Sequence, residues 1–218
     1  MKTCILFDLD GTLSDPKEGL LNSYQYALSA FGIREERENL TRFIGPPLRE
    51  SFASAYGFSP GEVEAVVAKF REFFAETGIY QNTVYPGIPE ALKALYDSGK
   101  TLCVATNKAA LYARQTIEFF RMDRYFTYIS GDEMDGSLSK GGKREIIRRA
   151  LEAVGATDLS AAVMIGDRKH DILGAKQAGI GSIGVLYGYG SREELEEAGA
   201  EALVNDANAL TGLLLGGL

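Results

Sequence analysis

The sequence predicts an α/β protein with a doubly wound, mostly parallel sheet and an inserted helical domain. Short β-rich runs alternate with helical patterns, which is typical of parallel sheets built from strand–helix–strand units. This alternation is interrupted once, after the first strand, by about 70 residues that carry helical signal only. A chain of 218 residues is long enough for one complete α/β domain and an insertion of that size.

The strand-like runs are short, apolar and separated by amphipathic segments. Residues 143–154 show a helical spacing of apolar positions, and Ser191–Glu194 has the pattern of a capping box that opens another helix. In such folds ligands bind at the carboxyl ends of the strands. The expected strands are 3–8, 101–106, 127–130, 161–166 and 180–186, with a weaker sixth at 202–204.

The helical insertion has recognisable starting points. Asp15 is expected to cap a helix that has Pro16 at its first position. Ser59-Pro60-Gly61-Glu62 shows the same pattern of a capping residue followed by proline. Tyr85-Pro86-Gly87 predicts a turn that leads the chain back into the sheet domain. The expected domains are therefore a core of residues 1–14 and 83–218 and a helical cap of residues 15–82.

Composition narrows the possible functions. A net charge of −7 and a pI near 4.9 disfavour nucleic acid and anionic membranes as partners, and they would repel a phosphate ligand unless its site supplied local positive charge. No apolar run reaches the 18 or so residues of a membrane span, so we expect a cytoplasmic protein. Cys4 and Cys103 both lie in apolar runs and are expected to be small buried hydrophobic residues. The sequence does not support a disulfide or a zinc site. The oligomeric state is not indicated.

Asp8 and Asp10 follow the first apolar run, in the motif Asp8-Leu9-Asp10-Gly11-Thr12. Side chains two residues apart on extended chain point the same way, so both carboxylates would converge at the end of the strand. Two carboxylates this close need a counter-charge, and a hard cation with oxygen ligands supplies one.

Three further motifs stand at the ends of later strands or the starts of helices. Thr106-Asn107 offers a hydroxyl beside backbone N–H groups, as in a phosphate site, although either residue could be a plain helix cap. Lys143, with Lys140 as an alternative, precedes the helix of residues 144–154. Gly166-Asp167 ends an apolar run, and Asp171 follows about one helical turn later.

These four ordered motifs resemble those of the haloacid dehalogenase superfamily, over essentially the whole chain, and Lys143 matches that family's spacing better than Lys140. The resemblance implies that Asp8 is the nucleophile that becomes an aspartyl phosphate, and that Asp10 is the general acid and base. It implies Mg²⁺ as the cofactor and a small phosphorylated metabolite as the substrate. The implied magnesium ligands are Asp8, Asp10 through its backbone carbonyl, Asp167 and, in support, Asp171; the implied phosphoryl-binding residues are Thr106, Asn107 and Lys143.

Asp10 favours the phosphatase branch, because dehalogenases of the family lack an acid there. Thr12 argues mildly against the sugar-phosphate mutase branch. Residues 43–49 and 184–190 resemble phosphoglycolate-phosphatase-type enzymes, a group that includes proteins labelled 5′-nucleotidases. A broad-specificity phosphatase and a non-catalytic phosphate-binding regulator remain as alternatives.

Arg49 is the candidate residue of the cap for binding the substrate. It follows Gly45-Pro46-Pro47, where the chain should enter a helix. In similar capped enzymes this segment faces the catalytic pocket, and a guanidinium there suits a carboxylate or a second phosphate. The alternative is a surface ion pair with Glu50 or Glu36.

Overall fold

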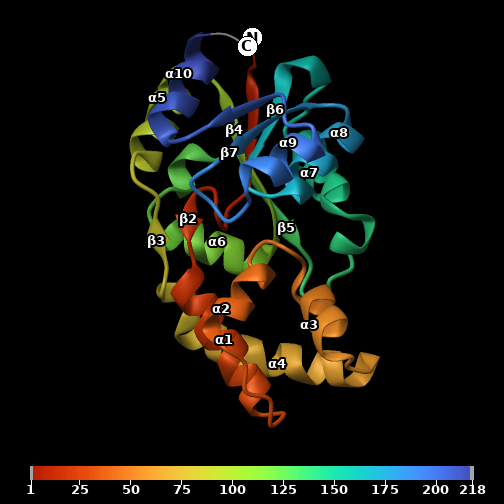
Figure 1. Cartoon of the computed structure of the whole chain (residues 1–218). Helices are drawn as coiled ribbons and strands as arrows, with labels where there is room; N and C mark the ends of the chain where they lie inside the picture. Colours follow the sequence, from red (N-terminus) through yellow and green to blue (C-terminus); the bar gives the residue numbers. More distant parts are fainter. Residues whose placement is uncertain (1, 217–218) are drawn as a thin grey trace. The chain divides into compact units, whose positions relative to one another are not determined.

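The computed structural model describes residues 2–216 and divides them into two compact units (Figure 1). One unit, called the core unit below, consists of the residues up to Asp15 and those from Val84 onward. The other, called the helical unit, is Pro16–Thr83. Each boundary lies one residue later than the sequence places it.

The core unit is built on a six-stranded sheet with the strand order β5-β4-β1-β6-β7-β8. Every strand pair described in it is parallel, so the predicted α/β fold with a parallel sheet is confirmed. The strands are β1 (Cys4–Phe7), β4 (Thr101–Ala109), β5 (Tyr128–Asp132), β6 (Ala162–Gly166), β7 (Gly181–Val185) and β8 (Ala202–Val204).

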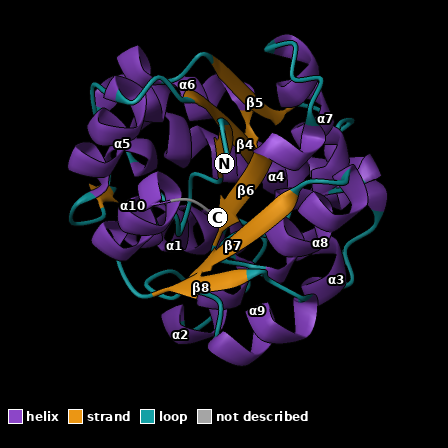
Figure 2. Ribbon diagram, turned by 90° about the horizontal axis from the view of Figure 1, so that it is seen from above, coloured by secondary structure: helices purple, strands orange, loops and turns teal. Residues whose placement is uncertain are grey.

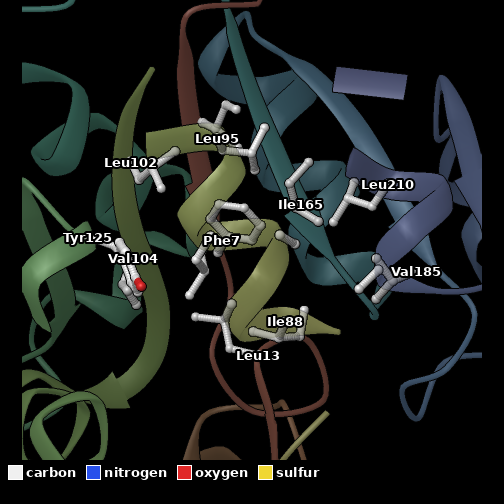
Figure 3. Packing of buried hydrophobic residues seen from close by; sticks show 14 of the residues in the cluster. Phe7, Leu13, Ile88, Leu95, Leu102, Val104, Tyr125, Ile165, Val185 and Leu210 are labelled. Carbon is white, nitrogen blue, oxygen red and sulfur yellow. The ribbon is translucent and has the colours of Figure 1, made fainter. Parts of the chain in front are cut away.

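Helices cover both faces of this sheet (Figure 2). β1 and β6 are apolar along their whole length because successive side chains enter the cores on opposite faces of the sheet. In β1, Ile5 and Phe7 join the core on one face (Figure 3), and Cys4 and Leu6 join the core on the other. The first face carries α5 (Ile88–Asp97), α6 (Ala110–Phe119) and α10 (Ala207–Gly216); the second carries α7 (Lys143–Ala153) and α8 (Lys169–Ala178), with α9 (Arg192–Ala198) against α8.

The order of the strands places β1 at a switch point. After β1 the chain builds outward on one side with β4 and β5, and then returns to the other side with β6, β7 and β8. In doubly wound sheets the crevice at such a point is where ligands bind. The carboxyl ends of β1, β4 and β6 therefore define the place to look for a site.

The helical unit is organised around aromatic side chains. The Tyr24 ring lies about 5 Å from the rings of Phe43, Phe52 and Phe70, and all four residues are buried. None of the described helices is long and apolar enough to cross a membrane. The helices of this unit are α1 (Lys17–Ser29), α2 (Arg37–Leu40), α3 (Leu48–Tyr56) and α4 (Pro60–Glu76), and the chain's 3₁₀ turns are Thr41–Phe43, Gly78–Tyr80, Asp123–Tyr125, Ser139–Gly141 and Leu159–Ala161.

Local sequence signals predicted one helix start in this unit and missed another. Pro60 opens α4, and the Glu62 carboxylate accepts the backbone N–H and the hydroxyl of Ser59, as expected of a capping box. The prediction of Asp15 as a cap is wrong. Pro16 stands at the cap position of α1, and the Asp15 carboxylate accepts the Tyr189 hydroxyl instead. The chain there forms the short strand β2 (Ser14–Asp15), which pairs with β3 (Thr83–Val84) where no strand was expected.

Leu92 on α5 tests how far the core depends on close packing. Its side chain is fully buried, so Leu92→Ala should lower the free energy of unfolding by about 2–5 kcal/mol through lost burial and the cavity left behind. Leu111→Ala on α6 is the matched control, because Leu111 is 49% exposed and its loss should cost no more than about 0.5 kcal/mol. Urea unfolding of both variants measures the difference, and similar values would contradict the assigned core.

Candidate active site

Three neighbouring strands deliver the predicted site residues to one edge of the sheet. β1 is hydrogen-bonded to β4 on one side and to β6 on the other. Asp8 follows β1, Thr106 lies near the end of β4, and Asp167 follows β6. All three side chains are buried, with exposures of 3% or less. Residues far apart in the sequence thus meet where the topology places a binding crevice.

Gly11 allows the chain to turn sharply just after β1. Its φ is +86°, and a Cβ there would lie 2.2 Å from the Asp167 carboxylate. A side chain at this position would therefore be both strained and in collision with Asp167. The turn also brings in Thr12, whose hydroxyl donates a hydrogen bond of 3.2 Å to Oδ1 of Asp167.

The loop between β7 and α9 packs directly on Asp167. The Tyr189 backbone N–H donates to Oδ2 of Asp167 over 2.8 Å. Gly188 and Gly190 make this approach possible, since a Cβ on them would lie 2.3 Å from the Asp167 Cβ and 1.9 Å from its backbone oxygen, respectively. Sequence reasoning did not find this contact, because a backbone N–H leaves no residue-type signal.

Three carboxylates form the centre of the site. Ligand atoms of Asp8, Asp167 and Asp171 all lie within 4.8 Å of one another, and each residue is buried. Burial raises the pKa of Asp167 well above its usual range, and the charges of Asp171 and Asp8 add to the effect. Burial likewise raises the pKa of Asp171 to about 6, despite the opposing charge of Lys143.

Lys143 supplies positive charge to this cluster. Its Nζ lies 3.0 Å from Oδ1 of Asp8 and 2.6 Å from Oδ1 of Asp171, and only 2% of its side chain is exposed. Burial disfavours the ammonium, but Asp171 and Asp8 outweigh that cost and raise the pKa of Lys143. Lys140, the alternative from the sequence, is exposed in a 3₁₀ turn.

Asp10 lies beside the three carboxylates and forms an ion pair with a second lysine. Lys108 Nζ is 2.8 Å from Oδ2 of Asp10, and both side chains are nearly inaccessible. Burial raises the pKa of Asp10, against the lowering effect of Lys108. The Asp10 carboxylate is not part of the three-carboxylate cluster, so a metal contact through its backbone carbonyl stays a prediction.

The charges of the site fit a divalent cation. Two ammonium groups, from Lys108 and Lys143, face four buried carboxylates, so two negative charges are left uncompensated when all the groups are ionised. Buried charge without compensation is costly, and hard cations prefer clustered carboxylate oxygens. The residues present can therefore hold such an ion between Asp8, Asp167 and Asp171.

The other predicted residues divide between the two units. Thr106 is buried at the site edge, where its hydroxyl accepts the Lys108 backbone N–H over 3.3 Å, and Asn107 follows it. Arg49 belongs to the helical unit, where Glu64 binds it through two hydrogen bonds of 2.6 and 2.8 Å. The ion pair described for Arg49 is therefore with Glu64, an acid that the sequence did not single out. Roles for these residues toward a substrate stay predictions.

Comparison with known proteins assigns this chain to a family. Residues 5–185 match the model of the haloacid dehalogenase-like hydrolases. The matched region contains both lysines and all four carboxylates of the site, and it covers most of the chain. The protein belongs to the haloacid dehalogenase-like hydrolase family.

Individual relatives extend along nearly the full length. A 5′-nucleotidase of Pseudomonas aeruginosa is 47% identical over 192 residues, which are 88% of this chain and 86% of the relative. A phosphoglycolate phosphatase of Agrobacterium fabrum is 32% identical over 216 residues, covering 96% and 91%. The crystal structure of a predicted phosphatase from Clostridium acetobutylicum superposes with a TM-score of 0.94 at 40% identity and covers 99% of each chain.

Gly190→Ala tests the packing of the β7–α9 loop on Asp167. The added methyl group would meet a backbone oxygen that has little room to move, so the free energy of unfolding should fall by about 1–3 kcal/mol. Gly212→Ala in α10 is the control, since a Cβ there meets nothing and should stabilise the helix by roughly 0.5–1 kcal/mol. Opposite signs in chemical unfolding are expected, and a neutral Gly190→Ala would contradict the described contact.

Proposed function

We propose that this protein is a Mg²⁺-dependent phosphomonoester hydrolase that works through an aspartyl phosphate on Asp8. The observation that carries the proposal is the buried group of Asp8, Asp167 and Asp171 around Lys143, at the switch point of the sheet. It is supported by membership of the hydrolase family and by relatives named as phosphatases.

In the first step, a carboxylate oxygen of Asp8 attacks phosphorus and the bond to the leaving oxygen breaks. The Leu9 N–H and Lys143 both contact Oδ1 of Asp8, which fixes the orientation of the carboxylate before the attack. Asp10 donates a proton to the departing alkoxide; its raised pKa makes the protonated form more accessible.

In the second step, the Asp10 carboxylate takes a proton from water, and that water attacks phosphorus. The bond to Asp8 breaks and inorganic phosphate is released, which restores the carboxylate of Asp8 and the protonated form of Asp10. Lys143 and the hydroxyl of Thr106 hold phosphoryl oxygens in the proposal, because positioning and charge neutralisation dominate phosphoryl transfer. When bound to Asp8, Asp167 and the Asp10 backbone carbonyl, with Asp171 in support, Mg²⁺ supplies the remaining neutralising charge.

Two substrate classes are candidates, and each rests on a relative. The 47% identity to a 5′-nucleotidase favours nucleoside 5′-monophosphates, and the 32% identity to a phosphoglycolate phosphatase supports 2-phosphoglycolate. Both are small phosphomonoesters of alkyl alcohols, so both need the proton that Asp10 is proposed to deliver. Nucleoside 5′-monophosphates are the first choice. Cytoplasmic location and closure of the helical unit over the site as a cap remain part of the proposal.

Asp8→Asn tests the nucleophile. An amide cannot form the acyl phosphate, so phosphate release from nucleoside 5′-monophosphates and 2-phosphoglycolate should fall on the order of 1,000-fold or more, with the fold retained. Asp97→Asn on the exposed face of α5 is the matched control and should behave like the parent protein. Comparing kcat/KM across the two substrates also ranks them. Turnover of either one at the parental rate by Asp8→Asn would overturn the proposal.

Mg²⁺ binding should depend on pH through the buried carboxylates. Their raised pKa values mean that the folded, metal-free protein retains protons that the unfolded chain releases, so this contribution to stability declines as pH rises from about 4 through the folded pKa values. Mg²⁺ replaces those protons. The rise in Tm on adding Mg²⁺ should therefore be larger at pH 8 than at pH 5.5.

At 100 times Kd the ion should add about 2.7 kcal/mol, equivalent to roughly 5–10 °C for a chain of this size. Thermal unfolding with and without Mg²⁺ measures this, and Asp167→Asn should remove most of the effect. A rise in Tm that is larger at pH 5.5, or that persists in Asp167→Asn, would contradict the assigned ligands.

A further inference from the structure

Lys108 lies on an irregularity of β4 that the neighbouring strand makes possible. The pairing of β4 with β5 runs in step as far as Thr106 and Gly131 and resumes at Ala109 and Asp132. Asn107 and Lys108 are thus extra residues in β4, and such bulges redirect side chains beside active sites. A Cβ on Gly131 would lie 2.7 Å from the Lys108 carbonyl oxygen, so only glycine admits the bulge at this depth.

The bulge leads Lys108 to one particular oxygen of Asp10. Nζ of Lys108 is 2.8 Å from Oδ2, and the two side chains are 6% and 12% exposed. Oδ1 of Asp10 is also buried, yet it has no hydrogen-bond partner among the described residues. Lys108 thus binds Oδ2 of Asp10, and Oδ1 can bind a group that comes from outside the protein. Buried polar atoms of this kind are rare and call for an explanation.

The two buried lysines have separate partners. Lys143 lies within 3.0 Å of Asp8 and Asp171, whereas Lys108 pairs with Asp10. A charge-assisted contact restricts the torsion of a carboxylate more strongly than a neutral one does. Proton transfer requires the carboxylate within hydrogen-bond reach of the reacting oxygen, and small displacements reduce rates steeply.

We propose that Lys108 is a positioning residue, which holds Oδ2 of Asp10 so that Oδ1 faces the leaving oxygen and then the attacking water. The inference deepens the proposed function and rests on the acid–base role of Asp10. It states that Lys108 acts on the reaction through Asp10 and not through the substrate.

Lys108→Met removes the ammonium and keeps a similar apolar length. With a nucleoside 5′-monophosphate at saturating Mg²⁺, kcat should fall about 10- to 100-fold while KM changes less than about 3-fold. With p-nitrophenyl phosphate, whose phenolate leaves without a proton, the fall should be several-fold smaller. Lys176→Met on the exposed face of α8 is the matched control and should leave both substrates unaffected.

A double-mutant cycle with Asp10→Asn decides whether Lys108 acts through Asp10. In the Asp10→Asn background, Lys108→Met should change kcat by less than about 2-fold, since there is no acid left to position. Multiplicative losses, an increase in KM at unchanged kcat, or full activity of Lys108→Met would each overturn the inference. The proposed function itself fails only if Asp8→Asn turns over substrate, so the two failures are distinguishable.

Gly131→Ala provides a second route that keeps the ammonium. The added methyl group should displace the bulge and with it Lys108, and should give the same loss in kcat on the nucleotide, again absent in the Asp10→Asn background. Circular dichroism melting identifies variants that retain the fold. A folded Gly131→Ala variant whose loss persists in Asp10→Asn would count against the inference.

Discussion

Four carboxylates are buried together at one edge of a parallel sheet, and their mutual repulsion is the constraint on which the rest of the core unit depends. An acidic protein offers no general positive field to offset them, so compensation has to be local. Lys143 and Lys108 provide it, one from the start of α7 and the other from the end of β4. The two lysines leave two of the four negative charges uncompensated when all the groups are ionised, and a divalent cation would balance them.

Close packing of backbone against carboxylates is what makes this arrangement possible. Because residues 11, 188 and 190 are glycines, the backbone at these positions can lie so close to Asp167 that a Cβ there would collide with it. Gly166 lies equally close to the side chain of Asp171. Gly174 on α8 lets α7 approach so closely that a Cβ there would be 2.7 Å from the Cβ of Lys143. The site is therefore specified as much by missing side chains as by charged ones, and its atoms have little freedom to relax.

The parts of this structure that follow from local patterns could be predicted from the sequence. Apolar runs located the six strands of the main sheet to within a few residues, and strand ends placed Asp8, Asp167 and Thr106 at one edge. Features set by distant partners could not be predicted. The orientation of Lys108 depends on a bulge paired with β5. Asp15 precedes Pro16 as a helix cap would. Its carboxylate instead accepts a hydrogen bond from the hydroxyl of Tyr189, which lies in a loop far along the chain.

The position of β1 in the chain has a consequence for how the enzyme is made. Cys4 pairs with Thr101 on one side and with Ala162 on the other, so the strand that leads to Asp8 is synthesised well before either of its neighbours. Closing so long a loop costs entropy that grows with its logarithm. The insertion reduces that cost once it has folded, because the Gly19 N–H and the Gln81 carbonyl oxygen then lie 3.1 Å apart and bring its two ends together. Once the helical unit has folded, residues 19 and 81 are adjacent, so the loop that remains to be closed between β1 and β4 is effectively shorter.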